Sequence, residues 1–302
     1  MPIQGNRSHD AMLSARYREI GLGPLSQVCT GQRRALRRQT GHTLLELMIA
    51  FALGLMLILA AVTLYRGQRE LFEQIVQRAR RMDAGLTALH LMSVHLRLAG
   101  FAGPGDAPPG VAILGCSLGR PRNLLDSSPK TTVCEPNAAS GSDGIEVRYR
   151  ADEVNTWASA EGCATDCLGQ AIVTDDASQA GAAALAVNRF FVRASPSTRA
   201  VELYGEGSGR FNVAQPMVEG IERLRIRYWL AGASRLVEAS AVPPAAWPQV
   251  AAVELCVLVR GTQRSLATSY IDCDGRRVTA SDGLPRDAFT TWVALRNRGL
   301  AW

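Results

Sequence analysis

The longest apolar run in the chain lies near its beginning. From Leu47 to Leu64 there is no charged residue and no proline, and about 18 apolar residues make the shortest stretch that spans a bilayer as a helix. Four basic residues come just before the run: Arg33, Arg34, Arg37 and Arg38. Positively charged flanks stay in the cytoplasm. The pattern therefore predicts that residues 42–65 cross the membrane and that the chain after them lies on the far side.

Two ordinary interpretations of this run remain open. A secretory signal peptide has an apolar core of about 7–15 residues followed by a small-residue cleavage site, but this run is longer and residues 65–70 offer no such site. A plain membrane anchor fits the length and leaves Glu46 unexplained. A carboxylate inside a spanning segment costs several kcal/mol unless it is paired or close to the interface. Glu46 is therefore a candidate functional residue.

A second apolar pattern continues the helix beyond the membrane. Apolar or small residues recur at alternating spacings of three and four: Phe72, Ile75, Ala79, Met82, Leu86, Leu89, Ser93 and Leu96. This spacing predicts an amphipathic helix over residues 66–99, and the glycines and proline of residues 100–105 are stop signals. We expect the stripe to pack into the core of a globular head, with a coiled-coil partner as the alternative. His90 and His95 are expected at interfaces rather than as ligands.

Beyond Pro109 the hydrophobic period changes from that of a helix to two. Six segments have strand character: residues 144–149, 188–193, 199–204, 221–230, 253–259 and 289–295. Strict alternation of apolar and polar residues is typical of half-buried strands, and turn-rich loops separate the segments. We expect an α+β fold in which residues 100–302 form a β-rich, mostly antiparallel head packed on the C-terminal half of the long helix.

The positive charge is concentrated at the N-terminus. The whole chain has 33 basic and 27 acidic residues, and residues 1–41 hold seven arginines and two acids. The rest has 26 basic and 25 acidic residues and is nearly neutral. Residues 1–41 are expected to form a cytoplasmic leader, with translation starting at Met1 or Met12. A nearly neutral head does not favour nucleic-acid binding.

The cysteine count agrees with export. Six of the seven cysteines lie outside the leader, which holds Cys29: Cys116, Cys134, Cys163, Cys167, Cys256 and Cys273. An even number in an oxidising compartment predicts up to three disulfides. The sequence allows many pairings, and we expect local ones: Cys116–Cys134, Cys163–Cys167 and Cys256–Cys273. Zinc is the alternative, but there is no Cys-x-x-Cys and no histidine near these cysteines.

Signatures of catalysis are absent from the sequence. It contains no glycine-rich phosphate loop, no Gly-x-Ser-x-Gly and no His-Glu-x-x-His, and no histidine follows His95, so the head lacks the commonest general base. Ser142-Asp143-Gly144 and residues 272–275 contain fragments of calcium loops, although Asp-Gly is more typical of a turn. We expect neither an enzyme nor a bound metal or cofactor.

The start of the apolar run, Gly41-His42-Thr43-Leu44-Leu45-Glu46, resembles the N-terminal signal of type IV prepilins. In that family a membrane peptidase cuts after the glycine and methylates the new N-terminus. The resemblance implies cleavage after Gly41, a mature chain that begins at His42, and Glu46 as its fifth residue. The α-amine of one subunit would then pair with Glu46 of a neighbour and set the stagger between them. The first mature residue of the family is usually phenylalanine, so His42 is a departure that bears on methylation.

Further stretches resemble the PilW family of type IV pilus minor pilins, in an order that covers most of the chain after residue 38. They are residues 96–103, 142–149, 218–222 with 226–228, and 289–298. The resemblance implies a pilin-like fold and a structural role in a complex at the pilus tip. The implied partners are the prepilin peptidase, other minor pilins, the major pilin, an inner-membrane assembly platform and a tip adhesin.

Two other functions remain open at this point. The J-type minor pseudopilin of type II secretion shares the signal, the size and the stretch around residues 218–228, while the ending Leu295–Arg298 favours the pilus protein. The other alternative is a membrane-anchored periplasmic binding module that does not polymerise. In each case the N-terminus would be cytoplasmic and the head periplasmic.

Overall fold

The structure is a computed structural model that describes residues 41–106, 108–123, 132–136, 141–152, 154–172, 183–265 and 268–297. The expected leader, with Cys29 and both candidate start sites, therefore lies outside the described residues, as does Arg298. The chain divides into two compact units, residues 1–60 and 61–302, and each is described by itself.

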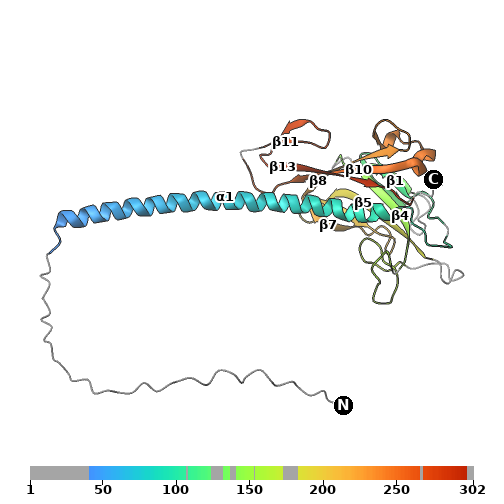
Figure 1. Ribbon diagram of the computed structural model, residues 1–302, viewed down its shortest axis with the longest axis horizontal. Coiled ribbons are helices and arrows are strands. Elements are labelled where there is room, and N and C mark those ends of the chain that lie inside the picture. Colours follow the sequence, from blue (N-terminus) through green and yellow to red (C-terminus); the bar gives the residue numbers. More distant parts are fainter. Residues whose placement is uncertain are drawn as a thin grey trace, which may run out of the picture. The chain divides into compact units, whose positions relative to one another are not determined.

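The first unit holds the beginning of a single long helix, α1 (Leu44–Leu98), which ends in the second unit (Figure 1). By length and composition α1 qualifies to cross a membrane, and none of its most apolar window is buried within the protein. Its first turns expose their large side chains: Leu44 is 79% exposed and Ile49 is 52% exposed. This apolar surface follows from the sequence, because residues 47–64 contain no charged side chain and so form no polar face that could be directed toward water.

The second unit contains two main sheets, and all strand pairs named here are antiparallel. The five-stranded sheet has the order β1 (Ile113–Cys116), β4 (Gly144–Ala151), β5 (Ala184–Ala194), β6 (Val201–Glu206) and β7 (Gln215–Glu219). The four-stranded sheet has the order β13 (Arg286–Ala294), β10 (Val250–Arg260), β8 (Ile221–Leu230) and β9 (Val237–Glu238).

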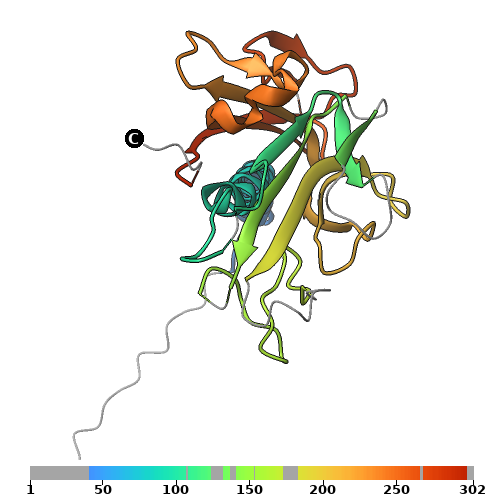
Figure 2. The same ribbon diagram turned by 90° about the vertical axis from the view of Figure 1, so that its right-hand side faces the viewer.

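Smaller elements complete the head. They are the hairpins β2 (Gly119–Asn123) with β3 (Thr132–Pro136) and β11 (Ser269–Ile271) with β12 (Arg277–Thr279), and the 3₁₀ turns η1 (Ala239–Ala241) and η2 (Pro244–Gln249). The expectation of an α+β fold with a long helix packed on an antiparallel, β-rich head is confirmed. Figure 2 looks along α1 and shows the four-stranded sheet, in orange and red, and the five-stranded sheet, in green and yellow, on different sides of the helix.

The core forms where the last turns of α1 meet both sheets. Ala88, Met92 and Leu96 are fully buried together with Tyr149 of β4 and Phe190 of β5. The helix then ends at Leu98. Gly100 follows with φ of +80°, a left-handed conformation that glycine adopts without strain.

At Gly85, α1 lies directly against β13 of the four-stranded sheet. A Cβ atom there would overlap the ring of Phe289 on β13. The absence of a side chain at Gly85 therefore allows the strand to lie against the helix, and the helix-breaking tendency of glycine is offset by this packing.

The expectation that the whole apolar stripe enters the core is wrong for its first half. Phe72, Ile75, Met82 and Leu86 are 49–66% exposed, and the stripe is buried only from Leu89 onward. The helical period thus continues beyond the turns of α1 that the head buries.

The structure contains two disulfides, Cys116–Cys134 and Cys256–Cys273. Both join the short-range pairs expected from the sequence, and each ties a hairpin to a main strand. The expected Cys163–Cys167 bond is absent, because both thiols are free. The backbone N–H of Cys163 donates to Ser159 Oγ at 3.2 Å, which keeps Cys163 on an exposed turn. That of Cys167 donates to Asn188 Oδ1 at 2.8 Å, which keeps Cys167 half-buried.

Candidate functional site

The site residues predicted from the sequence lie at the start of α1, where Thr43 fixes the backbone of the first helical turn. The backbone N–H of Glu46 donates to Thr43 Oγ1 at 3.3 Å, and that of Leu47 donates to the carbonyl oxygen of Thr43 at 3.2 Å. Thr43 thus caps the helix, and Glu46 occupies the third helical position, as in a capping box. A carboxylate is also favoured in the first turn by the helix dipole. This cap was not expected from the sequence, although the spacing Thr-x-x-Glu of Thr43 and Glu46 is typical of one.

Glu46 does not complete the capping box with its side chain. Its Oε2 atom lies 3.4 Å from Nδ1 of His42, four residues earlier. Both side chains are largely exposed, His42 by 79% and Glu46 by 66%. The structure therefore brings two of the three predicted site residues into contact on an otherwise apolar surface.

Gly41, the third predicted residue, has no structural reason to be glycine. A Cβ atom built there meets nothing within 4 Å, and its φ lies outside the left-handed region. Packing and backbone strain thus leave the residue type unexplained. The absence of a side chain is compatible with recognition by another protein, such as a peptidase.

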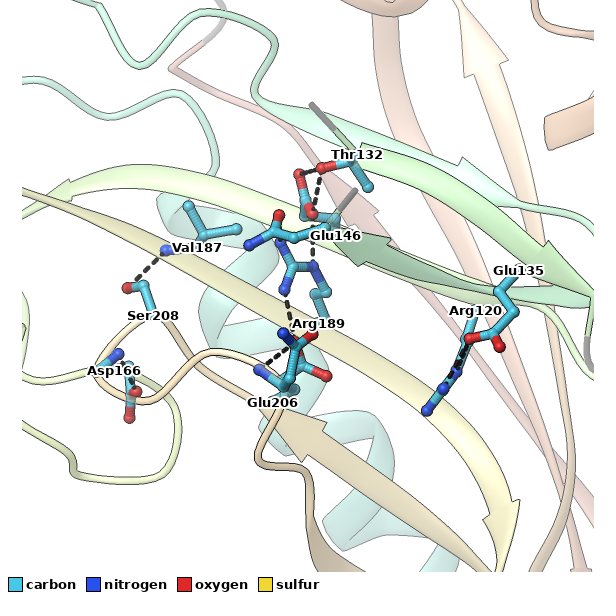
Figure 3. Close-up of polar contacts among 12 residues, drawn as sticks. Arg120, Thr132, Glu135, Glu146, Asp166, Val187, Arg189, Glu206 and Ser208 are labelled. Carbon is cyan, nitrogen blue, oxygen red and sulfur yellow. Dashed lines mark hydrogen bonds and ion pairs between the residues drawn. The ribbon is translucent and has the colours of Figure 1, made fainter. Parts of the chain in front are cut away.

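A second concentration of charge lies inside the head, around Arg189 of β5 (Figure 3). Arg189 is fully buried and donates to Glu146 of β4 at 2.7 Å, to Glu206 of β6 at 2.6 Å and to Asn123 of β2 at 2.6 Å. Arg148 forms a further ion pair with Glu146 at 2.6 Å. The group occupies the face of the five-stranded sheet opposite to α1, beneath the β2–β3 hairpin.

This cluster is suited to holding the fold rather than to catalysis. Thr132 of β3 donates to both carboxylate oxygens of Glu146, at 2.9 and 2.8 Å. Glu146 is wholly buried and Glu206 is 4% exposed, so the fold covers nearly all of both side chains. Buried charges that satisfy one another in this way fix which elements lie side by side.

The two fragments of calcium loops are turns and strand contacts in the structure. Asp143 accepts hydrogen bonds from the backbone N–H of Leu118 at 2.9 Å and of Ile226 at 2.8 Å, which ties the start of β4 to β8. Burial raises the pKa of Asp143 above its ordinary value, although these two hydrogen bonds oppose that shift. Asp272 accepts from the backbone N–H of Asp274 and Arg276. Both carboxylate oxygens of Asp143 and Oδ1 of Asp272 thus accept hydrogen bonds from backbone N–H groups.

The two histidines of the second half of α1 differ in environment. His90 is exposed, whereas His95 lies between α1 and the five-stranded sheet, with Nδ1 at 3.0 Å from the Tyr149 hydroxyl and its ring 5.4 Å from that of Phe190. Burial lowers the pKa of His95 to about 4. His95 is therefore a neutral core residue at physiological pH.

Two family models match the chain, one near its N-terminus and one in the C-terminal part of the head. Residues 36–62 match the family model for the prokaryotic N-terminal methylation motif, and residues 189–297 match that for type IV pilus-assembly protein W. The first match contains all three predicted site residues. The second runs from β5 to the end of the described chain and leaves the resemblances at residues 96–103 and 142–149 outside it.

No curated protein matches the chain. Among solved structures, a type IV-like pilin from Thermus thermophilus is 14% identical with a TM-score of 0.38, and the alignment covers 73% of this chain and 96% of that one. The family matches confirm the resemblance drawn from the sequence: the chain carries a prokaryotic N-terminal methylation motif, followed in the head by the sequence pattern of the PilW type IV pilus-assembly proteins.

Proposed function

We propose that this protein is a minor pilin that takes part in type IV pilus assembly, within a tip or priming complex. The observation that carries the proposal is the presence of a methylation motif and a PilW pattern in one chain, with a single membrane-length apolar helix at the motif. Its partners are other minor pilins, the major pilin and the assembly platform, and we assign it no catalytic role.

Processing is the first step of the proposed mechanism. Prepilin peptidase cuts after Gly41 on the cytoplasmic side and frees the α-amine of His42. The mature chain remains in the inner membrane through residues 42–65, with its head in the periplasm. The amine of one subunit then pairs with Glu46 of the next in the apolar helix bundle, where attraction between opposite charges is stronger than in water. This pairing sets the axial stagger of the subunits.

The cleavage step is tested by the N-terminal residue and intact mass of protein recovered from the membrane. We expect a chain that begins at His42, and we expect Gly41→Val to remain uncleaved and membrane-retained. Gly67→Val is the matched control, because Gly67 is also an open position, where a Cβ meets nothing within 4 Å, and it lies outside the methylation motif. Normal maturation of Gly41→Val would overturn the prepilin interpretation.

The assembly step is tested by Glu46→Ala. We expect normal cleavage, loss of the protein from sheared pili and reduced piliation. Glu70→Ala is the matched control, since Glu70 is an exposed glutamate on the same helix, outside the motif. Unchanged piliation in Glu46→Ala would favour a membrane-anchored module that does not polymerise. Loss of type II secretion with intact pili would favour a pseudopilin.

A further inference from the structure

Glu46 already has a partner within its own chain. His42 Nδ1 lies 3.4 Å from Glu46 Oε2, and because a carboxylate only accepts hydrogen bonds, the ring nitrogen is the donor. A spacing of four residues puts both side chains on the same face of the helix start. The Thr43 cap fixes that start, so the contact follows from the local backbone and needs no second chain.

In the mature chain that cleavage after Gly41 would produce, few other groups can reach this carboxylate. No charged residue occurs between Leu47 and Tyr65, and the first basic residue after Glu46 is Arg66. The helical rise of 1.5 Å per residue puts Arg66 roughly 30 Å away along the axis. The leucines around Glu46 are 66–79% exposed, so lipid or neighbouring helices that cover this surface also remove water from the carboxylate. A local donor reduces the resulting desolvation cost.

The proposed cleavage makes the position of this donor significant. When the chain begins at His42, one residue carries both the imidazole ring and the α-amine. The ring is directed at Glu46 of its own chain, whereas the amine is the group that must reach Glu46 of a neighbour. A phenylalanine at the same position would supply the amine without a competing donor.

We propose that His42 is a positioning residue that holds Glu46 within its own chain while the mature protein waits in the membrane, and releases Glu46 to the α-amine of a neighbouring subunit on assembly. This inference rests on the proposed function and adds a residue to its registry contact. The His42 ring and the neighbour's amine compete for the same carboxylate, so the ring weakens premature association of single chains.

A double-mutant cycle tests the competition directly. Wild type, His42→Phe, Glu46→Gln and the double variant are purified as mature full-length chains, and only molecules whose mass shows a start at His42, or at the phenylalanine that replaces it, are compared. Self-association in phosphatidylcholine vesicles is measured by energy transfer between copies labelled at the exposed thiol of Cys163. A second copy of the chain serves as the neighbouring subunit.

We expect His42→Phe to raise the association constant by about 1.4- to 2.3-fold, the factor that corresponds to one helical pair at this spacing. In the Glu46→Gln background the same change at His42 should have no effect. An equal effect in both backgrounds, no effect in either, or a decrease with Glu46 intact overturns the inference. If Glu46→Gln itself changes neither association nor incorporation into pili, the registry contact of the proposed function fails, and the inference fails with it.

Discussion

Replacing Arg189 by methionine provides the sharpest test of how the head is held together. The change removes a charge but keeps a long side chain in the same space. Glu146 and Glu206 each lose an ion pair of 2.6–2.7 Å, and Asn123 loses a donor at 2.6 Å. Removing one partner of a buried ion pair costs about 3–5 kcal/mol, because the remaining charge stays buried without compensation.

This cost converts into a measurable shift in thermal unfolding. For a unit of 150–250 residues, each kcal/mol changes the midpoint by about 2–4 °C, so we expect Arg189→Met to lower it by about 6–20 °C. The assay is the loss of near-ultraviolet circular dichroism of the mature full-length chain in detergent, with disulfides intact. The matched control is Arg120→Met. The Arg120 side chain is 26% exposed and pairs with Glu135 at 2.6 Å, and loss of such a surface pair costs at most about 1 kcal/mol.

The second variant separates lost charge from lost packing. Glu206 has Arg189 as its ion-pair partner, so Glu206→Gln combined with Arg189→Met removes the carboxylate that the single change leaves uncompensated. We expect the double variant to be more stable than Arg189→Met alone. If Arg189→Met unfolds within about 1 °C of the Arg120→Met control, or if the second change lowers stability further, the cluster does not hold the fold as reasoned.

Two further predictions concern the helix. We expect Gly85→Ala to destabilise the head by about 1–3 kcal/mol in urea unfolding, because the new Cβ overlaps the Phe289 ring. Gly67→Ala, which meets nothing within 4 Å, should instead stabilise the helix by up to about 1 kcal/mol, and equal effects of the two changes would contradict the packing at Gly85. The pKa of His95 is lowered to about 4 by burial, so between its unfolded value of about 6.5 and pH 4 the unfolded chain binds a proton that the folded chain excludes. The head should lose up to about 3 kcal/mol of stability as the pH falls through this window. The thermal unfolding midpoint should fall less with decreasing pH in His95→Gln than in the wild type. Identical profiles of midpoint against pH would refute the burial of a neutral His95.

Six of the described strands were predictable because their pattern is local: β4, β5, β6, β8, β10 and β13. The shorter strands were not among the expected segments: β1, β2, β3, β7, β9, β11 and β12. In β8 the side chains of Leu224, Ile226 and Tyr228 are buried, as period two requires, while the arginines between them lie on the other face. The alternation toward the end of β13 has the same cause. In β10, by contrast, residues 253–259 are buried on both faces, with Cys256 and Leu258 packed against Cys273. A sheet with one face on the core and the other toward polar surroundings makes this pattern directly visible in the sequence.

The burial of Arg189 was not predictable by the same reasoning. β5 has both faces covered, one by α1 and the other by the β2–β3 hairpin, from which Arg120 lies 5.4 Å from the Phe191 ring centre. From the alternating pattern of β5 alone, Arg189 is expected to face solvent. It is buried because the β2–β3 hairpin, more than 50 residues earlier in the chain, covers that face of the sheet. Local patterns do not report such long-range covering.

For α1 the sequence predicts the helix itself but not the extent of its packing partner. Its apolar stripe was read correctly as a periodic pattern, yet the period does not state where its partner ends. Leu89 and Leu96 face the sheets, whereas Phe72 and Ile75, in the same register, face outward. An apolar stripe on a helix indicates that some other surface packs against it. The sequence does not tell whether that surface belongs to the chain's own head or to another subunit.

The two charge sites of the chain differ in a way that bears on function. Arg189 pairs with Glu146 and Glu206 inside the head, so the free energy of these ion pairs contributes to the fold. Glu46 is 66% exposed on an apolar helix and has one long contact, at 3.4 Å, to a side chain of its own helix start. An exposed pair of this kind contributes little in water, but the same carboxylate gains strongly from a cation once apolar helices surround it. The Glu46 carboxylate therefore stays accessible to a cation from a second chain, and a contact between subunits requires such an accessible charge.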